Sequence, residues 1–162
     1  MKCFLGLLFF LLLPLSNLLG QVSSQPPALN LTFTTIDVPG AMITDIDGIN
    51  TAGDMVGSYE MPGETVGHGF LLSGGTFTFF DYPNADSTQA FGINDSGVIS
   101  GAAYVRGFTA GVSFLYSNGA FTTIRASGKS ATLARGINNA GVVVGGDGLS
   151  LSGTILAMAS II

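Results

Sequence analysis

The chain has 162 residues, of which 47% are hydrophobic and 9% are charged, and its formal net charge at pH 7 is −5. A negatively charged protein is a poor partner for nucleic acid or an anionic membrane, so neither class of partner is expected. Cys3 is the single cysteine, so the rest of the chain can form no disulfide and offers no thiol to a metal ion.

Residues 1–20 have the pattern of a secretory signal peptide. Lys2 provides a positively charged start, and the apolar run that follows ends at the polar Ser16. A membrane-spanning helix is disfavoured, because the run is shorter than about 20 residues and contains Pro14. We expect cleavage after Gly20 and export to the extracellular space, with the periplasm as the alternative. The mature chain would carry four basic residues against ten acidic ones.

A turn motif occurs three times, at a constant interval of 44 residues. The copies are GINTAG (48–53), GINDSG (92–97) and GINNAG (136–141). A fixed interval of this length is typical of repeat architectures, in which one supersecondary unit is copied and stacked. The chain then divides into a linker at 21–30 and a repeat domain at 31–162, with units 33–76, 77–120 and 121–162.

Each unit consists of short apolar or alternating runs that end in Gly, Asn, Asp or Ser, a pattern typical of β-strands. In the second unit these runs are Ser87–Ile93, Val98–Tyr104, Gly111–Tyr116 and Ala120–Ile124. We therefore expect an all-β fold of four-stranded repeats that resemble β-propeller blades, with a β-trefoil or β-prism as the alternative. The glycines that recur in the strand after the turn predict close backbone approach, and they are Gly57, Gly101 and Gly145.

The motif itself predicts a hairpin turn. Asn suits the first position of a type I turn, and Gly suits the fourth position, where it can adopt positive φ. The repeat turn positions are Gly48, Asn50, Gly53, Gly92, Asn94, Gly97, Gly136, Asn138 and Gly141. The Asn side chains are expected to bond the backbone of their own turn rather than a ligand.

His68 is the only histidine. A general base would be one interpretation, since imidazole titrates near neutral pH. Its counterparts one unit and two units later are Val112 and Leu156, which carry no such chemistry. We therefore favour a hydrogen bond at a strand edge.

Carboxylates occur in two arrangements. Asp45, Asp47, Asn50 and Asp54 resemble the start of a calcium-binding loop, but the string lacks the closing glutamate, so we favour solvated charges. Asp37 and Asp81 each precede a turn that contains Pro and are expected to accept backbone N–H bonds at a strand end. A glycosidase pair would need a separation of about 5 to 10 Å, which copies on adjacent repeats do not favour.

The sequence contains no nucleophile elbow, P-loop, zinc spacing or dinucleotide fingerprint, so no catalytic, metal-binding or cofactor-binding residue is predicted. Exposed aromatic side chains would offer flat faces for stacking on sugars, although most are expected to pack internally. The candidates are Tyr59, Tyr82, Tyr104, Phe108 and Tyr116.

The segments FTTIDVPGA (33–41), GINTAGDMVGSY (48–59) and GHGFLLSGGTFTFFDYP (67–83) resemble the HAF family of bacterial extracellular repeat proteins. The His-Ala-Phe triplet of that family appears here as His68-Gly69-Phe70, and then as Val112-Ser113-Phe114 and Leu156-Ala157-Met158. The resemblance implies secretion and tandem β repeats, and it implies no established activity.

We predict a secreted, non-enzymatic β-repeat protein that serves as a binding or structural module for an extracellular glycan or protein. A carbohydrate hydrolase or lyase at a propeller mouth and a fragment without independent function are the alternatives. The strand pattern further predicts a lone strand, Leu31–Ile36, before two four-stranded sets and a final three-stranded set. We expect the lone strand to pair with the terminal strand, within one chain or across a dimer of six blades, because both edges are then covered.

Overall fold

The computed structural model describes residues 30–105, 111–125, 132–146 and 155–158, and all of its regular structure is β. Close contacts divide the chain into residues 1–34 and residues 35–162. Within the first part only residues 30–34 are described, and they form neither helix nor strand. The predicted signal peptide (1–20) and most of the predicted linker (21–30) lie outside the described residues. The described part contains no helix of the length and apolarity that crossing a membrane requires.

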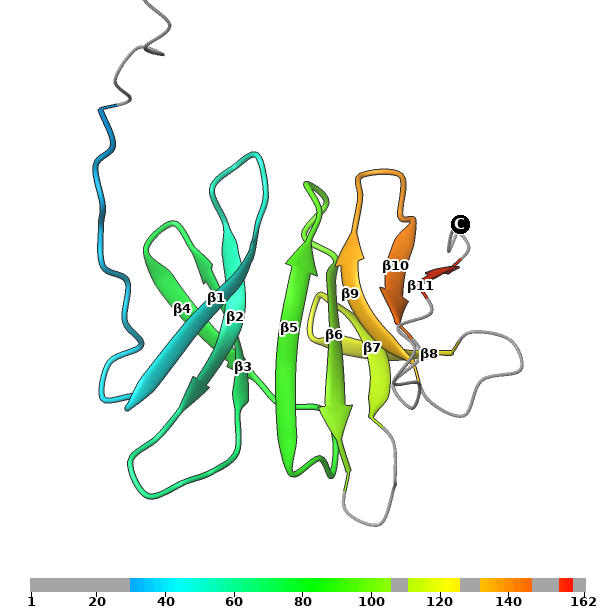
Figure 1. Cartoon of the computed structure of the whole chain (residues 1–162), viewed down its shortest axis with the longest axis horizontal. Coiled ribbons are helices and arrows are strands. Elements are labelled where there is room, and N and C mark those ends of the chain that lie inside the picture. Colours follow the sequence, from blue (N-terminus) through cyan, green and yellow to red (C-terminus); the bar gives the residue numbers. More distant parts are fainter. Residues whose placement is uncertain (1–29, 106–110, 126–131, 147–154, 159–162) are drawn as a thin grey trace, which may run out of the picture. The chain divides into compact units, whose positions relative to one another are not determined.

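Residues 35–162 form three antiparallel sheets, each made of consecutive strands (Figure 1). The first sheet holds β1 (Ile43–Ile49), β2 (Met55–Glu60), β3 (His68–Ser73) and β4 (Thr76–Phe80). The second holds β5 (Ser87–Ile93), β6 (Ile99–Tyr104), β7 (Val112–Ser117) and β8 (Ala120–Ile124). The third holds β9 (Leu133–Ile137), β10 (Val143–Gly146) and β11 (Ile155–Met158).

The all-β prediction is confirmed, as are the two four-stranded sets and the final three-stranded set. The four strands expected in the second unit occur: two have the expected bounds, one begins one residue later than expected, and one is displaced by one residue. None of the three described sheets closes into a barrel. Each four-stranded sheet combines the last three strands of one sequence unit with the first strand of the next, so its boundary lies a few residues after the unit boundary.

The prediction of a strand at residues 31–36 is wrong for the single chain, because these residues form no strand. Residues 32–36 correspond, at the 44-residue interval, to β4 and β8. Those strands pair with the third strand of the sheet before them, β3 and β7. No described sheet precedes residues 32–36, so the segment has no third strand with which to pair.

The recurring glycines lie opposite β-bulges in the first strand of each sheet. A side-chain carbon on Gly57, Gly101 or Gly145 would overlap a carbonyl oxygen of that neighbouring strand. The registers shift across the bulges, so the residue between the paired positions has no partner on the second strand. The predicted close approach is confirmed, since a strand bent by a bulge crosses nearer to its neighbour.

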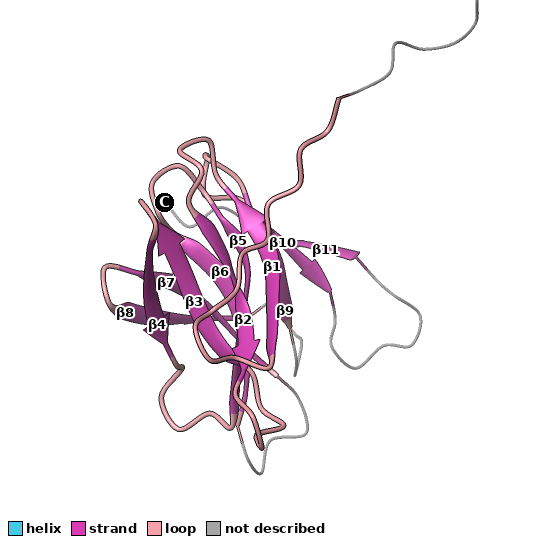
Figure 2. Ribbon diagram, turned by 90° about the vertical axis from the view of Figure 1, so that its left-hand side faces the viewer, coloured by secondary structure: helices cyan, strands magenta, loops and turns pink. Residues whose placement is uncertain are grey.

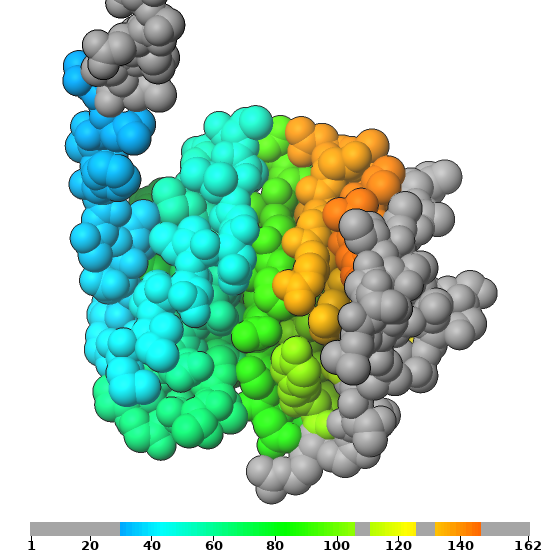
Figure 3. All heavy atoms as spheres, in the orientation of Figure 1, coloured from blue at the N-terminus to red at the C-terminus, as the bar shows by residue number. Residues whose placement is uncertain are grey.

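The sheets pack face to face in sequence order. Strand β5 packs on β1, β2 and β3, and β9 packs in the same way on β5, β6 and β7. The space-filling view shows this order as successive bands of colour from cyan to orange (Figure 3). The junction of the first two sheets buries Val56, Phe80, Ala90, Ile93 and Ile99. Burial of such side chains stabilises the fold by about 1.5 to 3 kcal/mol each, so the junctions between sheets form the core.

Candidate functional site

The three repeat turns have one shared geometry. In the second turn the N–H of Gly97 donates to the carbonyl of Asn94 at 3.0 Å, and Gly97 has φ 74°. The Asn94 side-chain oxygen accepts the N–H groups of Ser96 and Val98 at 3.1 and 2.9 Å. Equivalent bonds occur around Asn50 and Asn138. The predicted hairpin turn and the predicted role of Asn in its own turn are both confirmed.

The Asn side chains also join the repeats. The side-chain nitrogen of Asn50 donates to the carbonyl of Asn94 at 3.4 Å, and that of Asn94 donates to the carbonyl of Asn138 at 3.3 Å. Each bond spans 44 residues. We call this set of bonds the Asn ladder. Two further motif glycines, Gly48 and Gly92, keep the strands close enough for it, since a side chain on either would press on the next strand's backbone.

A second set of bonds runs beside the Asn ladder. The N–H of Thr51 donates to Asp95 Oδ1 at 2.9 Å, and the N–H of Asp95 donates to Asn139 Oδ1 at 2.9 Å. Asn139 Nδ2 also donates to Asp95 Oδ2, at 2.6 Å. The N–H of Thr51 and the side chain of Asn139 lower the pKa of Asp95. Sequence reasoning missed these residues, although each lies one position after a motif Asn.

The bulge residues of β1, β5 and β9 form an inner row, defined as Asp47, Phe91 and Arg135. The guanidinium carbon of Arg135 lies 5.4 Å from the centre of the Phe91 ring. Partial burial and the charge of Asp45 raise the pKa of Asp47, while Arg135 opposes the rise. Asp47 and Arg135 are exposed, and Phe91 is half-buried. The row therefore presents both signs of charge beside an aromatic ring, a combination suited to polar ligands.

The calcium-like string does not converge on one point. Asn50 Nδ2 donates to Asp54 Oδ2 at 3.0 Å, so these two side chains bond within their turn. The hydroxyl of Ser73 and the amide of Asn50 lower the pKa of Asp54. Asp45 and Asp47 lie on β1, away from the turn. No group of three His, Cys, Asp or Glu side chains in the described part is arranged to hold a metal ion.

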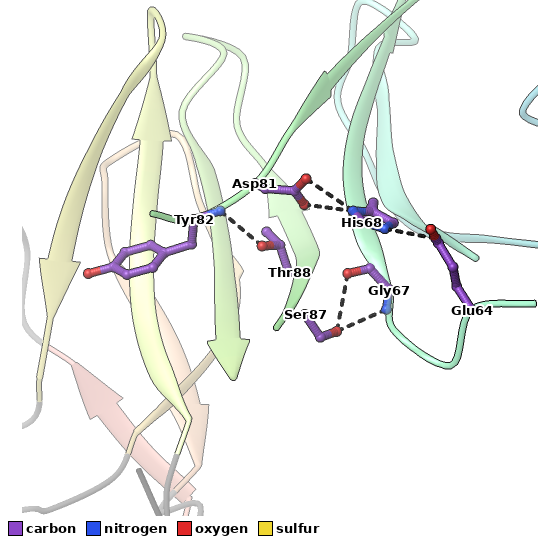
Figure 4. A network of polar contacts seen from close by, with 7 residues as sticks. All are labelled: Glu64, Gly67, His68, Asp81, Tyr82, Ser87 and Thr88. Atoms are coloured by element: carbon purple, nitrogen blue, oxygen red, sulfur yellow. Dashed lines mark hydrogen bonds and ion pairs between the residues drawn. The ribbon is translucent and has the colours of Figure 1, made fainter. Parts of the chain in front are cut away.

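His68 lies between two carboxylates at the start of β3 (Figure 4). Its Nδ1 is 3.0 Å from Asp81 Oδ2, and its Nε2 is 3.1 Å from Glu64 Oε2. Burial lowers the pKa of His68, but the bonds and charges of Asp81 and Glu64 outweigh it, so the pKa lies above its ordinary value of 6.5. Each ring nitrogen already faces a carboxylate oxygen, so neither is left without a partner. The expected hydrogen bond is present.

The polar contacts around His68 fix the crossover from β4 to β5. Asp81 opens that crossover, and His68 holds it to β3. The hydroxyl of Thr88 accepts the N–H of Tyr82 at 2.9 Å, and the N–H of Gly67 donates to the hydroxyl of Ser87 at 3.0 Å. The backbone bond expected of Asp81 is therefore made by Thr88 instead. Thr44 accepts the N–H of Val38 in the same way at 3.0 Å, which replaces the role expected of Asp37.

The candidate stacking aromatics pack internally in most cases. Tyr82 stacks on Phe114 with ring centres 5.8 Å apart, and Tyr116 stacks on Phe80 at 4.3 Å. Tyr59 lies 5.3 Å from the His68 ring, and Tyr104 is 47% exposed. Phe108 lies outside the described residues. The expectation that most of them pack internally is confirmed for the described side chains.

No protein-family model matches the chain, and comparison with curated proteins and with solved structures likewise gives no match.

Proposed function

We propose that the chain is a secreted, non-enzymatic β-repeat module that binds an extracellular glycan or protein through its inner row. The placement of the Arg135 guanidinium over the Phe91 ring, with Asp47 near enough to respond to the Arg135 charge, carries the proposal. The row crosses the first strands of all three sheets, so a ligand would bridge the repeats.

Other polar side chains already take part in hydrogen bonds within the protein, which supports a binding role rather than catalysis. His68 is held on both ring nitrogens, and Asn50, Asn94 and Asp95 serve the turns and the junctions between repeats. General acid–base catalysis needs a group free to exchange a proton with the substrate. Secretion, and membership of the HAF-like group of repeat proteins, rest on the leader pattern at 1–20 and on the motifs at 33–83.

Binding of the purified protein to a panel of polysaccharides and extracellular proteins tests the proposal. Arg135→Ala and Phe91→Ala should each weaken any binding at least about tenfold, because aromatic and arginine side chains dominate binding energy. Arg125→Ala is the matched control, since it removes the same charge from an exposed position at the end of β8. A ligand that binds all three variants as it binds the parent would contradict the proposal.

The hydrolase alternative has one specific observation in its favour, the raised pKa of Asp47 beside Asp45. Release of sugar from a polysaccharide, abolished by Asp47→Asn in a folded protein, would establish that alternative and overturn ours.

A further inference from the structure

The first sheet leaves uncovered the side that later sheets bury. We call this side, which bears Ile46 and Ile49, the front face; Figure 2 looks onto this sheet. Ile46 is 42% exposed, whereas its counterparts Ala90 and Ala134 are 0% exposed. Ile49 is 62% exposed, and its counterpart Ile93 is 6% exposed. The front face thus has the composition of an internal junction, but no described sheet packs on it.

The third sheet is also uncovered on one side. This side is opposite to the one that corresponds to the front face, and we call it the back face. Val144 is 46% exposed, while its counterparts Val56 and Ser100 are 0% exposed. Val56 lies in the junction between the first two sheets, so this position faces the next repeat in the array. The uncovered back face therefore matches the surface against which a front face packs.

The third sheet is also one strand short. Strand β11 forms its edge, whereas the other two sheets continue to β4 and β8. Residues 32–36 are the counterparts of β4 and β8, and they form no strand. Phe33 is 88% exposed, although its counterpart Phe121 packs on Phe114 with ring centres 5.1 Å apart.

The Asn ladder has matching ends. Asn138 Nδ2 has no acceptor among the described residues, while Asn50 and Asn94 both donate to the next turn. The carbonyl of Asn50 receives no side-chain amide from a described residue, although the corresponding carbonyls of Asn94 and Asn138 each receive one. Donor and acceptor therefore remain at opposite ends of the array.

From these observations we propose that two copies of the chain associate head to tail, with the front face of each packed on the back face of the other. Residues 32–36 of each copy add the fourth strand to the third sheet of its partner. The result is a closed ring of six sheets. Three blades are fewer than propellers use, whereas six lie within the usual range of about 4 to 8. A head-to-tail contact that closes also leaves no apolar face for further addition.

The test measures molecular mass by light scattering on protein expressed from its complete sequence in a secreting host. The parent should have twice the mass of one chain between about 1 and 100 µM. Ile49→Asp on the front face and Val144→Asp on the back face should each raise the dimer dissociation constant at least about tenfold, since each would bury an unpaired charge. Tyr104→Asp is the control, because it changes an exposed aromatic residue on the middle sheet and should leave the dimer intact.

Mixing the two face variants distinguishes head-to-tail pairing from other arrangements. Each variant retains one intact face, so an equimolar mixture should form a heterodimer, which would also show that both variants are folded. Failure of the mixture to associate, or a back-face variant that dimerises unaided, would overturn the proposal. A monomeric parent, or one whose mass grows without limit as concentration rises, would overturn it equally.

Deletion of residues 21–36 tests the strand exchange. The dimer should weaken at least about tenfold, because the third sheet loses its added strand and regains a bare edge. A deletion variant that dimerises as tightly as the parent would overturn this part of the proposal.

Discussion

Asn94 is 5% exposed and makes hydrogen bonds both within its turn and to the next repeat. Asn94→Ala would remove the side-chain acceptor of two backbone N–H groups and one of the two donors to the Asn138 carbonyl. We expect the free energy of unfolding to fall by about 2 kcal/mol, the scale of several lost local bonds. Urea denaturation measures the change.

Asn138→Ala is the matched control for Asn94→Ala. Asn138 makes the same bonds within its turn but is exposed and donates to no following turn among the described residues. The free energy of unfolding should fall less for Asn138→Ala, by about 1 kcal/mol. Equal losses would show that the bond between repeats contributes nothing to stability.

Ser100 is a second residue whose environment predicts a change in stability. Its hydroxyl is buried without a hydrogen-bond partner in the described part of the chain, and its counterparts are Val56 and Val144. Ser100→Ala removes the unsatisfied hydroxyl without adding an atom, so the free energy of unfolding should rise by about 1 kcal/mol. A fall in melting temperature would indicate that the hydroxyl has a partner in solution.

At the scale of the element, the contact between β6 and the bulge of β5 tolerates no side chain at Gly101. A methyl group there would overlap the Gln89 carbonyl and the Phe114 ring. We expect Gly101→Ala to lower the free energy of unfolding by about 3 kcal/mol, the upper range for overpacking. Gly146→Ala is the control in β10, because a methyl group there meets nothing within 4 Å. Similar denaturation midpoints for the two variants would contradict the bulge assignment.

The crossover between β4 and β5 should respond to pH through His68. Its pKa in the folded protein is raised above 6.5, so its contribution to stability is fully present below about pH 6.5 and is lost as pH rises through the folded value. The groups that face the ring are Glu64, Asp81 and Tyr59. Burial and the charges of the two carboxylates, Asp81 and Glu64, raise the pKa of Tyr59.

The measurement for His68 is the denaturation midpoint between about pH 5 and pH 9, compared with His68→Gln. The parent should lose more stability than the variant across that interval. Parallel curves would show that His68 is not charged in the folded protein.

Considering the whole molecule, the 44-residue interval and the local strand pattern predicted the strands and turns of the three sheets, but they also predicted a strand at 31–36 that does not form. Ser87–Ile93 and Ala120–Ile124 have the predicted bounds because their ends carry turn residues. The partners of His68 were not predictable, since Glu64 and Asp81 act through tertiary contact and have no equivalent pair in later units. The strand at 31–36 was wrong because a local pattern carries no information about whether a neighbouring sheet exists.

The inner row was only partly foreseen. The sequence pattern indicated Asp47 as part of a calcium-like string. It did not indicate Phe91 or Arg135, because three different residue types at equivalent positions form no recognisable repeat. Their common feature is the bulge, which depends on the register between strands and cannot be read from composition.

The packing of β5 between β1 and β9 has a consequence for how amide hydrogens exchange with solvent. Among the described residues, only the second sheet packs against a neighbouring sheet on each side. In repeat arrays, stability is close to a sum of unit and nearest-neighbour terms, so units at the ends open first. In the single chain, populated by dilution below the dimer dissociation constant, amides of β5 and β6 should therefore exchange by global unfolding, while those of β1 and β10 exchange earlier by fraying. Mass spectrometry after exchange into deuterium oxide measures the difference in exchange rate between the sheets. Uniform protection across the three sheets would mean that they unfold as one cooperative block.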